Sequence, residues 1–211
     1  MCHQIFSMSW IYSFLYNSQI NWLLRNFCYF FKGILPEKFQ IHPSGTLRLK
    51  VEQHTSIFLK TNQTSYVSKQ LFWNGAEHYE FTPVFLGLVK KIDVFFDIGS
   101  SIGYYSLLGA KVNKHLQVVA FEPSVGSMAY LKSNIELNDF SSRIQAEALA
   151  LSDRVGAVEF LISETPNIRR YTIYRESITW VQKLICPTIH HKWFLIRWII
   201  TSAQPNKLLW I

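Results

Sequence analysis

The sequence has few cysteines, and none of them lies at a spacing typical of a metal site. The three are Cys2, Cys28 and Cys186 in 211 residues. An odd and sparse set excludes a small secreted scaffold held by disulfides, so we expect reduced thiols in a cytoplasmic protein. His190 and His191 are adjacent but have no partner at metal-ligand spacing, and we expect no bound metal.

Long uninterrupted apolar runs and internal repeats are also absent. Polar residues break the aromatic N-terminus too often for a transmembrane segment or a convincing signal peptide. Apolar residues nevertheless recur at helical spacing over residues 23–31, around Arg25 and Asn26. This pattern favours a helix that packs against the rest of the chain, and a membrane-surface helix is the alternative. The apolar residues are Leu23, Leu24, Phe27, Phe30 and Phe31.

Acidic residues are scarce at the C-terminal end, which largely explains the net charge of +7. Residues 1–165 carry 14 Lys and Arg against 13 Asp and Glu, whereas residues 166–211 carry 7 against one, Glu176. The basic character therefore belongs to a Trp-rich tail, which argues against a uniform nucleic-acid-binding face. We expect this atypical tail to be the least firmly packed part of the chain.

The hydrophobic period changes along the chain and divides it into three segments. Residues 1–71 contain one or two short helices and then an alternating stretch that indicates a small antiparallel β element. Residues 72–165 alternate short apolar runs with amphipathic stretches, which predicts a parallel sheet with helices on its faces. Residues 166–211 continue neither pattern, which would leave one edge of the sheet unpaired unless the tail covers it.

The predicted α/β sheet has three parallel strands and a returning strand. Four apolar residues of its second helix share one face, from Val125 to Ile135. The expected elements are strands at 92–96, 116–121 and 144–150, helices at about 104–111 and 124–138, and a returning strand at 157–163.

A glycine-containing turn, DIGSSIG over residues 97–103, joins the first strand to the first helix. Glycine lets the backbone pass close to a ligand because it has no Cβ. Sheets of this kind bind ligands in the crevice beyond the carboxyl ends of their strands, where Asp97 would place a carboxylate. Taken alone, such a turn is also common where a strand and a helix merely pack tightly.

A second acid, Glu122, closes the second strand and follows Gly103 by 19 residues. The carboxyl ends of adjacent parallel strands lie at one edge of the sheet, so Glu122 should lie near the glycine turn. A carboxylate there can accept hydrogen bonds from both hydroxyls of a ribose. The alternative for Glu122 is an ordinary solvated acid at a strand end.

Two familiar motifs are missing around this turn. The G-x-G-x-x-G fingerprint is absent and Asp97 precedes the first glycine, which disfavours a nicotinamide-dependent reductase, the rival enzyme reading. Ser100 and Ser101 are not surrounded by G-x-S-x-G, which disfavours a hydrolase nucleophile.

Three consecutive blocks of the sequence resemble the FkbM family of methyltransferases. Together with an upstream segment they cover about residues 72–162. The Phe-Glu-Pro triplet, the Asn-Ile-Glu-Leu-Asn helix end and the Ala-Leu-Ser-Asp turn make the match more specific than a glycine turn alone. One departure is Ser101, where the family more often has asparagine. The blocks are VFFDIGSSIGYYSLLGAK, VVAFEPSVGSMAYLKSNIELN and ALALSDRVGAVEF, and the upstream segment is FWNGAEHYE.

The resemblance implies an incomplete Rossmann-like sheet of the class I methyltransferase type, with an N-terminal helical and antiparallel extension. It also implies S-adenosylmethionine as cofactor, and a hydroxyl of a sugar, glycan or related metabolite as methyl acceptor. By the same resemblance, the glycine turn lines the methionine and ribose, Glu122 holds the ribose hydroxyls, and Leu149 and Ala150 lie against the adenine; the turn residues are Asp97, Gly99, Ser101 and Gly103. The resemblance also suggests that Glu80 and Tyr79 close the pocket from the N-terminal side. The alternative for this pair is an ordinary pair on a helix surface.

In the family a further strand carries a Lys-x-Asp-x-Glu-Gly-type segment that faces the transferred methyl. Nothing after Glu164 in this chain resembles it. The resemblance therefore implies a C-terminally truncated domain whose catalytic base is unassigned. An inactive fragment or degenerate relative is the alternative that is not an enzyme.

Overall fold

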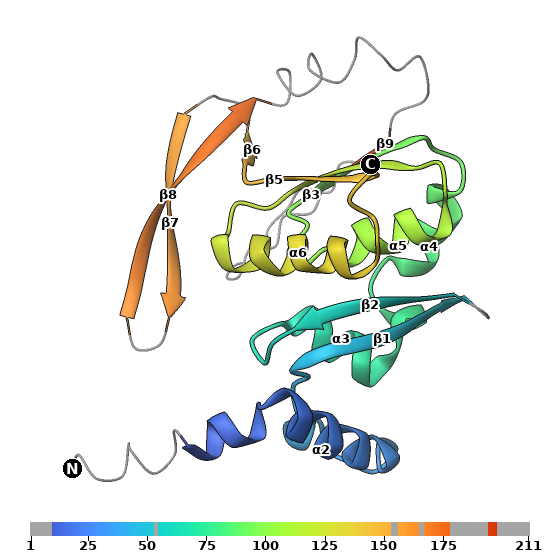
Figure 1. The fold of residues 1–211 in the computed structure, drawn as a ribbon, viewed down its shortest axis with the longest axis vertical. Helices are drawn as coiled ribbons and strands as arrows, with labels where there is room; N and C mark the ends of the chain where they lie inside the picture. Colours follow the sequence, from blue (N-terminus) through green and yellow to red (C-terminus); the bar gives the residue numbers. More distant parts are fainter. Residues whose placement is uncertain (1–9, 53–54, 153–155, 165–166, 178–193, 198–211) are drawn as a thin grey trace. The chain divides into compact units, whose positions relative to one another are not determined.

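The computed structural model shows two compact units, Met1–Leu86 and Gly87–Ile211 (Figure 1). Helix α4 (Thr82–Val89) contains the division between them. The described residues are 10–52, 55–152, 156–164, 167–177 and 194–197.

The first unit contains a two-stranded antiparallel sheet and several short helices. In the sheet, Leu47 lies opposite Leu59 and Leu49 opposite Ile57, and all four side chains are buried. The intervening Arg48 and Lys50 are exposed. The antiparallel element predicted from alternation is therefore confirmed. The elements are residues 10–15 (helical), α2 (Ser18–Phe30), η1 (Glu37–Phe39), β1 (Gly45–Glu52), β2 (Thr55–Thr61), α3 (Tyr66–Asn74) and η2 (Ala76–His78).

Helix α2 is joined to the start of β1 by polar side chains. Arg25 donates hydrogen bonds to the carbonyl oxygens of Ser44 at 2.6 Å and Thr46 at 3.2 Å. Asn21 accepts from Arg25 at 3.0 Å and from the Ser44 N–H at 2.8 Å, and donates to the His42 carbonyl at 3.0 Å. Asn21 and Arg25 are the buried residues of this helix, and burial lowers the pKa of Arg25.

The expectation that the apolar side of this helix packs against the chain is wrong in this unit. Leu23, Phe27, Phe30 and Phe31 are exposed, and Leu24 is half-buried. The physical reason is that Asn21 and Arg25 lie one turn apart and make several buried hydrogen bonds. Together they fix the rotation of the helix and turn the opposite, apolar side outward.

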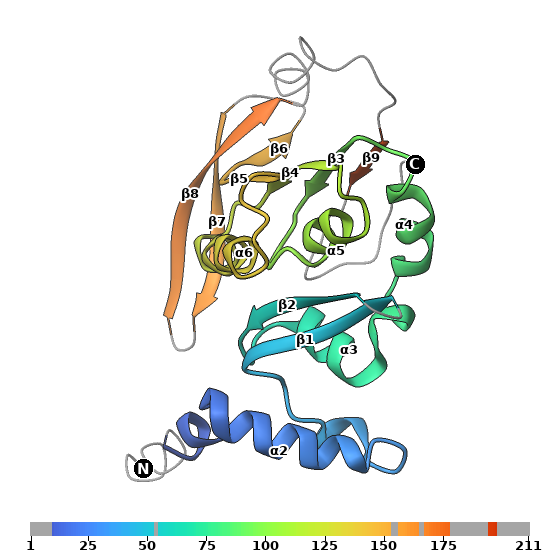
Figure 2. The same cartoon turned by 45° about the vertical axis from the view of Figure 1, so that its right-hand side comes forward.

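The second unit is built on a parallel sheet of order β5-β4-β3-β9 (Figure 2). In its register Asp97 lies opposite Ala120 and Ile98 opposite Phe121. Both crossover helices cover the same face, because successive strands are added in one direction by crossovers of one hand. The parallel sheet and both helices are confirmed, although Val125 is exposed. The elements are β3 (Val94–Ile98), α5 (Tyr104–Val112), β4 (Gln117–Phe121), α6 (Val125–Leu137), β5 (Ile144–Glu147) and β9 (Phe194–Arg197).

Strand β9 comes from the tail and pairs in parallel with β3, with Ile196 opposite Asp97. This edge of the sheet is therefore not left unpaired, because the tail covers it, as the sequence allowed. A four-residue strand in a mostly apolar stretch is too short to show a period that distinguishes it from a helix. Tail residues 178–193 and 198–211 lie outside the described residues, so loose packing of the tail stays a prediction.

The third predicted strand is shorter than expected, and the chain after it enters a separate sheet of order β6-β8-β7 (Figure 2). The returning strand exists, but it pairs antiparallel with β8 and not with the parallel sheet. Alternation shows that a segment is extended, whereas the choice of partner strand depends on residues far away in sequence. The strands are β6 (Ala150–Ser152), β7 (Gly156–Glu164) and β8 (Asn167–Ser177).

We predict that Arg25→Ala loosens helix α2, because the carbonyls of Ser44 and Thr46 lose their buried donor. Hydrogen exchange of the α2 amides should become about 30-fold faster, corresponding to about 2 kcal/mol. The matched control is Lys50→Ala, a cation exposed on β1, which should leave the exchange nearly unchanged. Equal exchange in both variants would contradict this account of the helix.

Candidate functional site

The turn between β3 and α5 is tied to the carboxyl end of β4 by backbone hydrogen bonds. The N–H groups of Gly99 and Ser100 donate to the Phe121 carbonyl at 2.9 and 3.0 Å. Gly103 closes the turn by donating to the Ser100 carbonyl at 2.8 Å. The turn thus lies at the edge where open α/β sheets bind ligands.

Gly103 is required by helix packing. Its φ of +91° lies in the left-handed region, and a Cβ there would lie 2.6 Å from Cδ1 of Leu131 on α6. The glycine lets the start of α5 approach α6 closely. Packing alone accounts for a glycine at this position, so contact between Gly103 and a cofactor stays a prediction.

Ser101 also adopts a left-handed backbone, with φ +51°. This conformation directs its N–H to Oε2 of Glu122 at 2.8 Å. Asparagine tolerates the left-handed region better than serine. The serine at this position is therefore under more backbone strain than an asparagine would be.

Glu122 follows β4 directly and joins the turn to the start of α6. Its Oε2 accepts from Ser101, and its Oε1 accepts from the N–H of Ser124 at 2.8 Å. The side chain is buried, so Glu122 is not the solvated acid of the alternative interpretation. Burial raises the pKa of Glu122, and the two backbone N–H groups lower it.

Asp97 is a buried carboxylate on β3, only 3% exposed. The hydroxyl of Ser106 on α5 donates to its Oδ2 at 2.5 Å. Burial raises the pKa of Asp97 to about 6, the hydrogen bonds from Ser106 oppose that rise, and the charge of Glu122 adds to it. Within the described part of the chain, neither carboxylate has a Lys or Arg partner, so this edge of the sheet is electronegative.

The structure therefore brings five of the predicted site residues together at one edge: Asp97, Gly99, Ser101, Gly103 and Glu122.

Leu149 is half-buried against the apolar cluster formed by Val94, Phe96 and Phe121. Ala150 opens β6 and does not end the third strand, which stops at Glu147. That detail of the expectation is wrong, because the chain leaves the parallel sheet between these two strands. Contact of either residue with an adenine stays a prediction.

Glu80 and Tyr79 belong to the first unit. Tyr79 is buried and Glu80 exposed. Partial burial raises the pKa of Glu80, and a hydrogen bond with the Tyr79 side chain lowers it. Closure of the pocket by this pair remains a prediction.

Two polar residues of the site were not identified from the sequence. Ser106 holds Asp97, and Asn134 of α6 donates to the carbonyl of Ile102 in the turn at 2.9 Å. Both are fully buried. Each is a small polar residue among the apolar residues of its helix. A buried polar side chain requires a hydrogen-bond partner, so this pattern in the sequence could have identified both residues.

The described residues contain no cluster of three or more His, Cys, Asp or Glu side chains that could hold a metal ion. His190 and His191 lie outside the described residues, so the expectation about them is untested.

Comparison with protein-family models finds no match, and comparison with curated proteins finds none. Among solved structures, the O-methyltransferase from Bacillus cereus in complex with SAH is 24% identical over 30% of this chain and 30% of its own, with a TM-score of 0.29. The SAM-dependent methyltransferase from Agrobacterium tumefaciens is 13% identical over 54% and 41%, with a TM-score of 0.35. M. jannaschii TYW2 in complex with AdoMet is 18% identical over 54% and 53%, with a TM-score of 0.36.

The chain thus spans less than two thirds of each of these structures. Identities and TM-scores this low do not bear on ligand, substrate or family. The strand order β5-β4-β3-β9, with the site at the carboxyl end of β3 and β4, is that of one part of a Rossmann-like sheet. The fold is α/β, an incomplete Rossmann-like sheet with an N-terminal helical and antiparallel extension.

We predict that Gly103→Ala lowers the unfolding free energy by about 2–4 kcal/mol, because it adds a left-handed alanine and a clash with Leu131. The control is Gly126→Ala on α6, whose Cβ would meet nothing within 4 Å. That variant should be neutral or more stable by up to about 1 kcal/mol. Urea unfolding measures both, and similar losses in the two variants would refute the packing role.

We predict that Asp97→Asn stabilises the second unit at pH 7. The pKa of Asp97 is about 6 in the folded chain against 3.8 for the free group, so the folded state binds more protons between these values. Its stability then falls as the pH rises through about 6, by an amount on the order of 2 kcal/mol. The variant should gain this amount at pH 7 and nothing below pH 4.

Urea unfolding midpoints of the wild type and Asp97→Asn, compared at pH 7 and below pH 4, measure the effect. The exposed Asp93→Asn is the control and should show no such pH dependence. A gain that is independent of pH would show that the buried charge is not its cause.

Proposed function

We propose that the second unit binds S-adenosylmethionine and is part of a methyltransferase of the FkbM type. The observation that carries the proposal is the pair of buried carboxylates, Asp97 and Glu122, beside the glycine turn. A buried electronegative edge favours a ligand with positive charge and hydroxyl donors. S-adenosylmethionine has both, in its sulfonium and ammonium groups and its ribose.

Glu122 has acceptor capacity left for a ribose. Each carboxylate oxygen has two lone pairs and accepts one backbone N–H, so one pair on each oxygen remains. The two hydroxyls of a ribose match two such oxygens. Because Ser101 and Ser124 already hold the carboxylate, little side-chain entropy is lost on binding.

The remaining cofactor contacts follow from the neighbouring residues. Gly99 and Ser101 present backbone in the turn to the methionine part, and Leu149 offers an apolar surface for the adenine next to Phe121. Ala150, the next residue in the chain, would extend this surface beside the adenine. Glu80, with Tyr79, closes the pocket from the N-terminal side by the family resemblance.

When bound, the cofactor supplies a methyl group activated by its sulfonium. The protein has to hold an acceptor in line and provide a group that takes the acceptor's proton. The family resemblance favours a hydroxyl of a sugar, glycan or related metabolite as acceptor. No residue of this chain is assigned as the base, and nothing after Glu164 resembles the family's Lys-x-Asp-x-Glu-Gly-type segment. We therefore expect the chain to bind the cofactor and to transfer its methyl slowly or not at all.

A nicotinamide dinucleotide fits this edge less well. Its pyrophosphate normally lies at the N-terminus of the first crossover helix, here that of α5. Two negative charges would then lie near Asp97 and Glu122, and like charges in a buried site repel strongly.

We also propose a cytoplasmic location and an acceptor other than nucleic acid. The location is proposed because the three cysteines are an odd and sparse set, and Cys28, the one in the described residues, carries a free thiol. Residues 72–165 carry 11 acids against 7 Lys and Arg, which disfavours a polyanionic acceptor. Among the helices that the structure describes, none is long and apolar enough to cross a membrane.

We predict that Glu122→Gln binds S-adenosylmethionine about tenfold to a hundredfold more weakly, since each charge-assisted bond to the ribose contributes about 1.5–3 kcal/mol. Asp97→Asn should bind more weakly too, although we expect it to be more stable than the wild type. Glu136→Gln, an exposed acid on α6, is the control and should bind normally.

Calorimetry with S-adenosylmethionine on the four proteins decides the question, with circular dichroism to show that each is folded. Weaker binding by the more stable Asp97→Asn variant cannot result from unfolding. Unchanged affinity in both site variants would remove these carboxylates from the site.

A further inference from the structure

The first unit presents an apolar surface to its surroundings on helix α2. The fractional exposures are 54% for Trp22, 61% for Leu23, 68% for Phe27 and 84% for Phe30. Leu23, Phe27 and Phe30 follow the i, i+4, i+7 spacing of one helix face. Residues 10–15 add four more exposed apolar side chains: Trp10, Ile11, Tyr12 and Phe14.

This surface is held outward by the polar contacts on the other side of α2. The guanidinium of Arg25 and the amide of Asn21 are buried at the start of β1, so the helix cannot rotate without breaking their hydrogen bonds. Large exposed apolar surfaces of this kind mark interaction sites.

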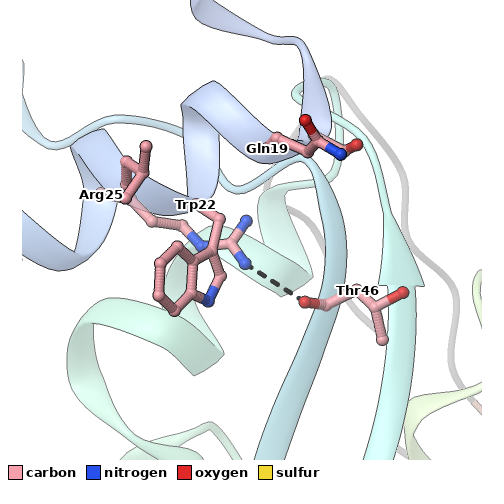
Figure 3. A pocket seen from close by; sticks show the side chains of 6 residues that line it. Gln19, Trp22, Arg25 and Thr46 are labelled. Carbon is pink, nitrogen blue, oxygen red and sulfur yellow. Dashed lines mark hydrogen bonds between the residues drawn. The ribbon is translucent and has the colours of Figure 1, made fainter.

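A pocket of about 430 Å³ lies where the helix meets the sheet, lined by Trp22 and Leu23 on one side and Thr46 on the other. Figure 3 shows Arg25 reaching from α2 to Thr46 of β1, with the ring of Trp22 beside it. Thr46 begins the outer row of β1, which continues with the exposed Arg48 and Lys50. The apolar side of the helix is therefore continuous with a basic face of the sheet.

The charge of this part of the chain is one-sided. Residues 1–36 contain no Asp or Glu, and residues 1–71 carry seven Lys and Arg against two acids. Lys32, just after α2, is exposed. Aromatic side chains beside cations are the composition of helices that lie in the interface of an anionic bilayer.

We propose that the apolar face of residues 10–31 docks onto the surface of an anionic phospholipid membrane, with the basic face of β1 against the headgroups. Phe27, Phe30 and Leu23 enter the acyl boundary, and Trp22 lies at headgroup depth. Lys32 and Lys50 face the negative lipids, which are abundant in the cytoplasmic leaflet. The proposal does not depend on the cofactor site, which lies in the second unit.

A second copy of the chain is a less suitable occupant. A symmetric dimer through this face would place two surfaces against each other from a segment, residues 1–71, that carries seven Lys and Arg against two acids. Like charges across an interface oppose association, whereas a negative membrane favours it.

Flotation of the full chain with vesicles tests the proposal. The protein should bind vesicles of phosphatidylcholine with phosphatidylserine, bind phosphatidylcholine alone much more weakly, and be released by salt. Phe27→Ser with Phe30→Ser should lower vesicle binding by at least about tenfold, because the variant loses two apolar side chains that would enter the bilayer. Both side chains are exposed, so the double substitution should leave the fold intact. Lys32→Glu with Lys50→Glu should also lower binding, by about tenfold or more.

The matched controls lie on the second unit. Val125→Ser with Leu137→Ser removes two exposed apolar side chains, and Lys91→Glu with Lys114→Glu reverses two exposed cations. Both should bind vesicles as the wild type does. Equal losses in the controls, or no vesicle binding by the wild type, would overturn the proposal. A wild-type dimer that the phenylalanine variant converts to a monomer, or capture of single-stranded RNA in place of vesicles, would assign the face to another partner and overturn it as well.

Discussion

The carboxylate of Glu122 is the contact on which the ligand edge of the second unit depends. It accepts the Ser101 N–H from the glycine turn and the Ser124 N–H from the start of α6. The glycine turn is thereby held to the segment that joins β4 to α6, although Ser101 and Glu122 are 21 residues apart in the sequence. The same two oxygens keep lone pairs free, which in the proposed function accept the hydroxyls of a ribose.

Burying the two carboxylates of this site lowers the stability of the folded second unit. Asp97 and Glu122 are both buried, and burial raises the pKa of each. A folding unit without a ligand would be more stable with neutral residues at these positions. The hydrogen bond from Ser106 and the backbone donors reduce that cost without removing it. A cationic ligand would remove more, which links the electrostatics of the free chain to the proposed cofactor.

The first unit shows the opposite arrangement of polar and apolar groups. In α2 the polar Asn21 and Arg25 form the packed face, and the apolar residues are exposed. A helix of this kind cannot be explained by burial within its own unit, because hydrophobic surface drives packing only where it is removed from water. Its orientation is consistent with a surface that is completed by a partner outside the unit.

The sequence alone determined the elements whose signal is local. Period two gave β1, the apolar runs gave β3 and β4, and amphipathic spacing gave α5 and α6. Parallel strands share one carboxyl edge, which is why the sequence alone predicts that Asp97 and Glu122 lie close together.

Only the tertiary structure decided which face of α2 packs, that β9 pairs with β3, that the chain changes sheets after Glu147, and that Ser106 holds Asp97. These features depend on partners far away in the chain. The periodicity of a segment shows which side chains share a face, and long-range hydrogen bonds and packing then determine what that face contacts.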